Sequence, residues 1–406
     1  MPAIYAPSVS IAGTPGKPGP ARLAFLLLFP GFFFYQTLIG MGMVGAVLGG
    51  YFSVVSLGLF PPLAYVYYLG IKASGYRVAS TDLHFGFFLF YFWVIVAINA
   101  AFGANATIVK THLLSILYFI NIYLIFKQGD FSERRTIATT LTSLLLMSAT
   151  IFFFSQEGSF QPGQFGDPTS PESVATYQEL ARSYVLTFVT VICFTRVLAV
   201  RLVLYAIAAA ALFLNGARSE LVAALFLCPM IELYRAKHWL PFFYLVLLVS
   251  GLASIDPTLL ANRFPESRVW ELFDLSQSSS ATARHELTEH ALRTIAENPV
   301  LGAYASYPPG GYSHNILSAW VDLGIFGFVY MLFMLVRTAA GLCRRGWLIR
   351  PRSGQFLLAW SLICISLLLL ATAKTFDDMF FGAAMGAYAN YRSSERSTRR
   401  QRESRR

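Results

Sequence analysis

Apolar runs of about 20 residues, the length of helix that crosses a bilayer, recur along the chain from Leu23 to Tyr391. Short polar or basic stretches separate these runs. The pattern predicts an all-α, polytopic integral membrane protein with about twelve transmembrane helices. The expected spans are residues 23–40, 50–71, 85–103, 108–126, 136–155, 183–200, 202–216, 219–236, 239–255, 314–336, 355–373 and 376–391.

Two polar segments, residues 156–182 and 256–313, are too long to be turns between spans. The second is expected to form a large, partly helical periplasmic loop between spans nine and ten. Within it, residues 282–296 place Leu287, Ala291 and Ile295 on one face, and this spacing predicts an amphipathic helix that lies over the membrane core. Thr282 is its expected N-cap, and Asn298 followed by Pro299 closes it.

The chain therefore divides into five regions. These are residues 1–22, a disordered cytoplasmic tail rich in Pro, Gly and Ser; residues 23–255, spans one to nine; residues 256–313, the periplasmic loop; residues 314–391, spans ten to twelve; and residues 392–406, a basic cytoplasmic tail. No cleavable signal peptide is expected, because the first apolar run begins only at Leu23.

The composition excludes a soluble protein, since 56% of the residues are hydrophobic and only 13% are charged, against about 25% in soluble domains. The net charge of +10 does not indicate nucleic-acid binding, because the basic residues lie in short loops and in the final tail. The four cysteines lie in apolar runs or a basic loop, so neither a disulfide framework nor a metal cluster is predicted. No metal or cofactor is expected.

The distribution of basic residues predicts the orientation. An even number of spans puts both termini on one side, and the arginine-rich tail marks that side as cytoplasmic. With this topology only eight of the 31 lysines and arginines face the other side of a bacterial inner membrane. They are Lys110, Arg182, Arg218, Arg263, Arg268, Arg284, Arg293 and Lys374.

A loop rich in Pro and Gly delivers His314 and Asn315 to the outer end of the tenth span. A histidine that is neutral near pH 7 can accept a proton from a hydroxyl group, so His314 is a candidate general base. The alternative is a histidine that caps the helix or lies among lipid headgroups. Asp322, further along the same span, is expected to face the bundle interior because a lone carboxylate in lipid is costly.

Several cations could bind an anion on the outer side. Arg218 follows an Asn-Gly turn at the start of a span, where backbone amides and a guanidinium form an anion site; pairing with Glu220 or snorkelling is the alternative. Arg284 opens the amphipathic helix and could instead be a solvated helix charge. Arg268 and Arg293 are similar candidates with less support, and Lys110 is expected, with His112, to anchor at lipid headgroups or contact a lipid phosphate.

Asp377 and Asp378 could hold a divalent cation at the outer end of the last span. Two adjacent carboxylates without a third ligand make a poor cation site, so a solvated turn is the favoured interpretation.

Together these features resemble the O-antigen ligase and O-antigen polymerase superfamily of bacterial membrane glycosyltransferases, over residues 202–327 and in helix number and orientation. Residues 216–219 are similar to the family's arginine turn, and residues 282–302 to its large periplasmic loop. Ser313, His314 and Asn315, followed by Gly324 and Gly327, resemble its His-Asn signature. Eight residues separate Asn315 from Gly324 where the family pattern has nine, and Asp322 stands near a customary glutamate.

The resemblance implies transfer of a glycan from an undecaprenyl-diphosphate-linked donor to a sugar hydroxyl, with inversion and without a metal. Arg218 and Arg284 would bind the diphosphate, His314 would activate the acceptor, and Asn315 would fix the imidazole or the acceptor. For a ligase the acceptor is lipid A core, and for a polymerase it is a carrier-linked repeat. Length and helix number favour the ligase.

A transporter of polysaccharide or of lipid-linked oligosaccharide is the alternative from another class. Such proteins have related halves and charged or broken helices near mid-membrane, and the sequence shows neither feature.

Overall fold

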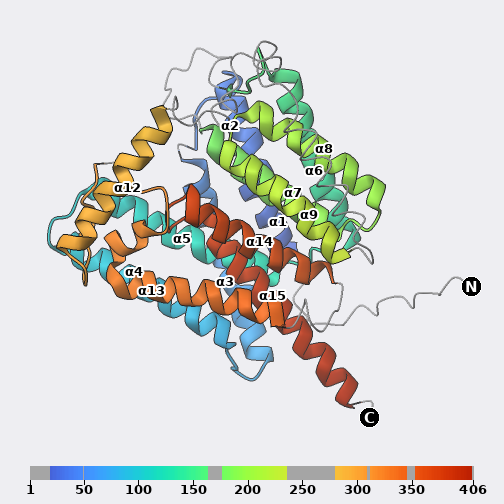
Figure 1. The fold of residues 1–406 in the computed structure, drawn as a ribbon. Helices are drawn as coiled ribbons and strands as arrows, with labels where there is room; N and C mark the ends of the chain where they lie inside the picture. Colours follow the sequence, from blue (N-terminus) through green and yellow to red (C-terminus); the bar gives the residue numbers. More distant parts are fainter. Residues whose placement is uncertain are drawn as a thin grey trace, which may run out of the picture.

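The computed structural model describes residues 19–48, 50–162, 176–235, 279–308, 311–344 and 353–404. Every regular element in these ranges is a helix (Figure 1). The elements are α1 Gly19–Leu26, η1 Leu27–Gly31, α2 Phe32–Gly40, α3 Tyr51–Ala73, α4 Ser80–Ala101, α5 Ala106–Gln128, α6 Arg134–Phe154, α7 Tyr177–Phe194, α8 Leu198–Asn215, α9 Arg218–Arg235, α12 Ser279–Glu297, α13 Leu317–Leu342, α14 Gly354–Thr372 and α15 Met379–Ser404.

Eight helical segments in the described ranges are long and apolar enough to cross a membrane, which confirms a multi-pass, all-helical protein. They are Gly19–Gly40, Tyr51–Ala73, Ser80–Ala101, Ala106–Gln128, Arg134–Phe154, Leu198–Asn215, Leu317–Leu342 and Gly354–Thr372. The total of twelve stays a prediction. The expected ninth span, residues 239–255, lies outside the described residues, as does most of the predicted loop before α12.

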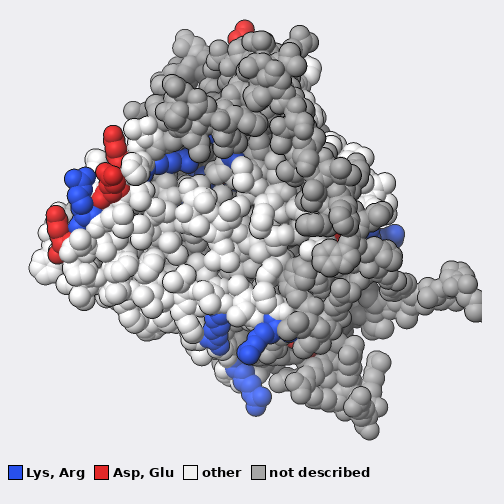
Figure 2. All heavy atoms as spheres, viewed as in Figure 1, with Lys and Arg blue, Asp and Glu red and all other residues white. Residues whose placement is uncertain are grey.

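The outward faces of these helices are apolar. Phe90 of α4 is 61% exposed and Leu57 of α3 is 65% exposed, although both side chains would be buried in a soluble protein of this size. On the face drawn in Figure 2, charged side chains gather beside α12 and at the lower edge, with a broad uncharged band between them. A lipid-facing surface explains this pattern, because hydrocarbon contacts apolar side chains at no cost.

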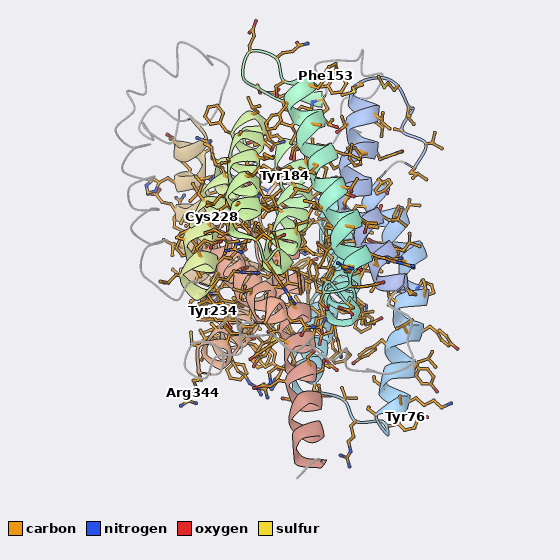
Figure 3. All side chains as sticks on the ribbon, turned by 90° about the vertical axis from the view of Figure 1, so that its right-hand side faces the viewer. Tyr76, Phe153, Tyr184, Cys228, Tyr234 and Arg344 are labelled. Atoms are coloured by element: carbon orange, nitrogen blue, oxygen red, sulfur yellow. The ribbon has the colours of Figure 1, made fainter. Side chains whose placement is uncertain are left out.

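Two opposite ends of the bundle can be recognised. Figure 3 shows Tyr76, which follows α3, and Arg344, which follows α13, at one end, and Phe153 of α6 at the other. The chain therefore alternates direction through these helices, as the predicted topology requires.

Helix α7 differs from the predicted span 183–200, since it begins at Tyr177 and ends at Phe194. Thr176 caps it in a capping box with Glu179, so the helix starts in a polar segment that hydropathy assigns to a loop. Nearly all of its later residues are buried among other helices. Packing against protein, not lipid, allows α7 to carry polar residues such as Arg182 near its start.

Helix α15 also departs from prediction. It packs along both α5 and α14, and it continues to Ser404 through most of the segment expected to be a separate basic tail. Asn390 anchors it by donating hydrogen bonds to the carbonyl groups of Phe126 and Gly129, at the end of α5. The apolar pattern stops at Tyr391, but the helical backbone does not, because charged residues are good helix formers in water.

The amphipathic helix is confirmed as α12, although it begins at Ser279, three residues before the predicted cap. Its residues Ala291 and Ile295 are buried in a small cluster with Tyr307 and with Val321 of α13. The predicted apolar face thus fixes α12 across the start of α13 (Figure 1).

Helix α13 is broken at Gly324, which adopts φ 68° and ψ 179°, whereas the sequence predicts no broken span. The loop after α12 docks there: the amide of Ala303 donates to the Val321 carbonyl at 2.8 Å, and the amide of Ile325 to the Val300 carbonyl at 3.1 Å. A Cβ on Gly324 would lie 2.5 Å from the Val300 carbonyl oxygen, which is too close. Glycine is therefore required both because no side chain fits and because the positive φ is unfavourable for other residues. The break occurs near the end of the helix that carries His314.

Candidate active site

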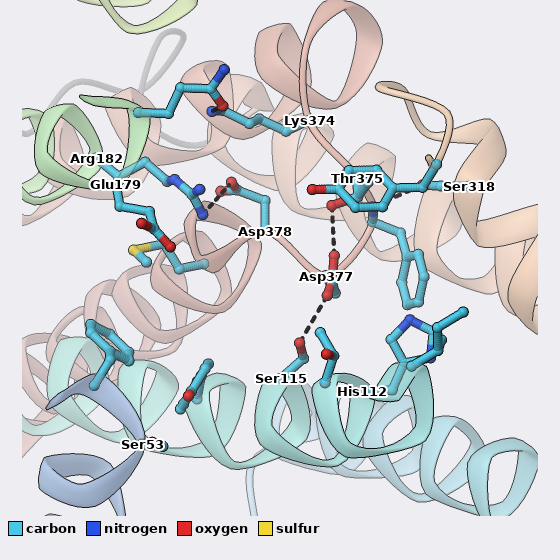
Figure 4. Close-up of a pocket in the computed structure, with 18 of the residues that line it drawn as sticks. Ser53, His112, Ser115, Glu179, Arg182, Ser318, Lys374, Thr375, Asp377 and Asp378 are labelled. Atoms are coloured by element: carbon cyan, nitrogen blue, oxygen red, sulfur yellow. Dashed lines mark hydrogen bonds and ion pairs between the residues drawn. The ribbon is translucent and has the colours of Figure 1, made fainter. Parts of the chain in front are cut away.

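A cavity of about 560 Å³ lies where α5, α7, α13 and α15 begin. Its polar lining is rich in hydroxyl groups and charges and includes His314, Arg182, Lys374 and the carboxylates Glu179, Asp322, Asp377 and Asp378. Figure 4 shows Arg182 and Glu179 of α7 facing Asp378, with Ser115 and His112 of α5 on the other side of Asp377. We call this the His314 cavity.

Both cations that line the His314 cavity are paired. Arg182 Nη1 lies 3.5 Å from a carboxylate oxygen of Asp378, which is only 5% exposed. Lys374 Nζ lies 2.6 Å from a carboxylate oxygen of the fully buried Glu220 and donates to Gln178 at 3.1 Å. A buried carboxylate without a partner is costly, so these cations are needed by the fold before any ligand binds.

Asp377 and Asp378 do not form the solvated turn that the sequence favoured. Asp377 accepts hydrogen bonds from Ser115 at 2.8 Å and from Thr375 at 2.6 Å (Figure 4). Asp378 is buried against Arg182. The prediction was wrong because these partners come from α5 and α7, which are distant in sequence. In the described residues no group of three His, Cys, Asp or Glu side chains is placed to hold a metal ion.

His314 is a half-buried wall residue of this cavity, three residues before α13 begins. Its ring is hydrogen-bonded to the backbone of Ala373 and lies 5.2 Å, centroid to centroid, from the ring of Tyr312. Burial, with Arg284 and Lys374 nearby, lowers the pKa of His314 to about 4. The imidazole is therefore neutral at pH 7 and can accept a proton.

Arg284 contributes one of the positive charges that His314 senses, although it does not line the cavity. It is half-buried on α12, and the described residues provide it with no carboxylate partner. Figure 2 shows basic side chains in the depression beside α12. Among the predicted site cations that the structure describes, Arg284 is the one that it brings into electrostatic range of His314.

Asn315 is occupied by structural contacts. Its Oδ1 accepts from the Leu317 amide at 2.9 Å and from Ser313 at 3.0 Å, and its Nδ2 donates to Thr288 of α12 at 3.4 Å. The side chain thus caps α13 and ties that helix to the helix carrying Arg284. This arrangement holds His314 and Arg284 near one another.

Likeness to known proteins does not decide among these interpretations. Comparison with protein-family models gives no match, and comparison with curated proteins gives none either. The functional argument therefore depends on the site itself.

The other predicted residues lie elsewhere. Arg218 is half-buried at the start of α9, two residues before the Glu220 that holds Lys374, and it does not line the cavity. Arg293 is exposed on α12 and Lys110 is exposed on α5. Arg268 lies outside the described residues.

Two basic residues of the cavity wall were not predicted as site residues, although their charge on the outer side is visible in the sequence. Arg182 and Lys374 belong to the eight cations predicted on the outer side, but neither stands in a recognisable motif. His112 was expected to anchor at headgroups; instead it is only 7% exposed and bonds the Tyr304 hydroxyl at 3.0 Å. The pattern of charges in a sequence can suggest such residues as candidates. Only their tertiary contacts show whether they line a cavity or face the lipid.

The arrangement combines a neutral base, positive charge near it, and a large cavity with a polar wall. Carboxylates, hydroxyls and aromatic rings that surround a cavity of this size suit a ligand with many hydroxyl groups, such as a sugar. An anion would be placed best beside Arg284, because the wall itself carries more carboxylates than cations.

Proposed function

We propose that this protein is a membrane glycosyltransferase that moves a glycan from undecaprenyl diphosphate to a sugar hydroxyl at the His314 cavity. The observation that carries the proposal is the neutral imidazole of His314 at a polar cavity within electrostatic range of Arg284. Transfer requires a base for the acceptor hydroxyl and positive charge for the departing diphosphate, and this pair supplies both.

In the proposed reaction the acceptor sugar occupies the cavity, where its hydroxyl groups meet the polar wall. His314 takes the proton as the acceptor oxygen forms the new bond to the anomeric carbon. The bond between that carbon and the diphosphate oxygen breaks on the opposite side, which gives inversion. Arg284 stabilises the charge that develops on the diphosphate, assisted by Arg218 if substrate binding brings α9 and α12 together.

Transfer to lipid A core, the reaction of an O-antigen ligase, is the preferred form, and polymerisation onto a carrier-linked repeat is the alternative. The site is assigned to the periplasmic face of the bacterial inner membrane, with both termini cytoplasmic. Lipopolysaccharide from a deletion strain separates the two reactions. Loss of a ligase leaves carrier-linked polymer, whereas loss of a polymerase leaves core with a single repeat.

A transporter of lipid-linked glycan is less well supported. The break in α13, at Gly324, lies seven residues after the helix begins and eighteen before it ends, so it falls in the first third of the helix and not at its middle. The buried pair of Lys127 with Asp82 joins the last turn of α5 to the first turn of α4, not the middle of either span. A central charged or broken site is therefore lacking in the described spans.

The test is a reaction with the purified full chain in lipid nanodiscs, carrying donor and acceptor. We expect free undecaprenyl diphosphate to appear in equal amount with the new glycosidic bond. In proteoliposomes, donor that crosses the bilayer without cleavage would instead establish transport and refute the proposal.

A further inference from the structure

A second cavity, of about 350 Å³, lies between the start of α4, the end of α13 and the middle of α15. Its charged lining residues are Arg337, Arg344 and Arg392, and no carboxylate is among the described residues that line it. His84 and Tyr388 complete the polar wall. We call this the Arg337 cavity.

The guanidinium groups of this cavity are largely available to a ligand. Arg337 is exposed and donates only to the Ser80 hydroxyl, at 3.2 Å, among the described residues. Arg344 is exposed and lies at the lower extremity of the bundle in Figure 3. Arg392 pairs with Glu395 on its own helix at 3.7 Å, and a long pair of two partly exposed side chains contributes little.

Arg337 and Arg344, which have no carboxylate among the described lining residues, add to the charge of Arg392 and make the cavity attractive to an anion. The amino end of α4 lies in the same wall and adds the partial positive charge of its free amide groups. Arginine is well suited to phosphate, because its planar group can bond two oxygens at once.

The depth of this cavity matches a headgroup layer. From Ser318, which lines the His314 cavity, to Arg337 the chain advances nineteen positions, or about 28 Å along the path of α13 at 1.5 Å per residue, with the break at Gly324 between them. The hydrocarbon core of a bilayer is about 30 Å thick. The two cavities therefore open at opposite membrane surfaces.

An apolar surface adjoins the arginines on the side toward mid-membrane. Phe333 and Val336 of α13 are 45% and 56% exposed, and Leu83 and Phe87 of α4 are 61% and 47% exposed. A soluble phosphate or nucleotide has nothing to place there, whereas a phospholipid would lay its acyl chains along these two helices with its phosphate at the arginines.

We propose that the Arg337 cavity binds the phosphate headgroup of an anionic phospholipid, with its acyl chains against α4 and α13. The proposal is independent of glycan transfer, because it uses neither His314 nor the cavity around it. In the predicted orientation this lipid belongs to the cytoplasmic leaflet.

The test measures lipid binding to the purified full chain in detergent by native mass spectrometry, with phosphatidylglycerol as the probe. Dissociation constants are compared for the wild type, for Arg337→Gln/Arg344→Gln, and for Arg134→Gln/Arg135→Gln, which removes two exposed arginines outside the cavity. Loss of two arginine contacts is expected to weaken binding about twenty-five-fold, at about fivefold each, while the control changes little.

Arg337→Lys/Arg344→Lys, which keeps both charges, should retain most of the affinity and show that the Gln variant has not simply misfolded. Equal binding by the wild type and the Gln variant would overturn the proposal. So would binding of phosphatidylcholine as tight as that of phosphatidylglycerol. Competition by millimolar inorganic phosphate would identify a site for a free anion and would also overturn it.

Discussion

The His314 cavity lies at the start of α13 and α15, whereas the Arg337 cavity lies at the end of α13 and the middle of α15, and the two organise charge in opposite ways. In the first, Arg182 and Lys374 are paired with buried carboxylates from other segments. In the second, the described lining residues include three arginines and no carboxylate. A wall in which each cation is already paired with a carboxylate does not attract an anion and can surround a neutral polyhydroxylated ligand, whereas the arginines select an anion.

The difference also separates residues that hold the fold from residues that are free to act. Removing a partner from a buried pair leaves an uncompensated charge, while removing an exposed arginine leaves only water in its place. On this basis Arg182 and Lys374 maintain the His314 cavity, and in the proposed reaction His314 and Arg284 perform the chemistry. Substitutions of Arg182 or Lys374 should therefore lower stability, whereas substitutions of His314 or Arg284 should lower activity.

The largest effect is expected for His314→Ala. Loss of the base should lower the rate of glycan transfer about a thousandfold, with little change in stability, because the ring is only half-buried. Transfer is measured in membranes of a deletion strain supplied with the variant. The matched control is His285→Ala, an exposed histidine of α12 that should keep its rate. Near-normal product from His314→Ala would refute the base assignment.

A comparable loss, but in stability, is expected for Lys374→Met. Glu220 would keep its charge in a fully buried position, and the free energy of unfolding should fall by about 3 kcal/mol. Thermal unfolding in detergent checks this. The double variant Lys374→Met/Glu220→Gln should recover much of the loss because it leaves no buried charge unpaired. A single variant as stable as the wild type would show that the ion pair is not needed by the fold.

A smaller effect is expected for Arg284→Gln, about a hundredfold in kcat/KM, the usual cost of removing one preorganised charge at a developing anion. Arg293→Gln, on the exposed side of the same helix, provides the control and should be near normal. If kcat/KM falls by the same factor in both variants, the effect comes from the total charge of α12, and Arg284 has no specific role.

The smallest effect concerns pH. In the proposed mechanism the neutral form of His314 is the active one, and its pKa is lowered to about 4, so kcat/KM should stay constant as pH falls from 8 to about 6 and decline only at lower pH. Arg284→Gln removes a cause of the lowering, so its decline should begin at a higher pH. Identical profiles in wild type and variant would show that Arg284 does not act on His314.

Much of the scaffold could be predicted from the sequence, because apolar runs and the spacing of Leu287, Ala291 and Ile295 are local signals. Most expected spans agree with the described helices to within a few residues, and the expected span 239–255 lies outside the described residues. The exceptions are α7, whose start lies in a polar segment, α13, which ends six residues later than expected, and α15, which continues past its apolar run. The break at Gly324 was missed because it depends on docking of the loop after α12.

The site was predictable only in part. His314 and Arg284 stand in recognisable motifs, and the structure brings them within electrostatic range. The pairs of Arg182 with Asp378 and of Lys374 with Glu220 join segments far apart in sequence, and no local pattern specifies them. The Asn-Pro and Gly signals also proved to have a structural use, since residues 298–303 dock at the α13 break.

The most direct test of this account is a cryo-electron microscopy structure of the full chain with bound undecaprenyl diphosphate. We expect density for the diphosphate between Arg284 and His314, at the rim of the larger cavity. Density for that group at the Arg337 cavity alone, or against surfaces remote from His314, would contradict the assignment of the reaction to this site.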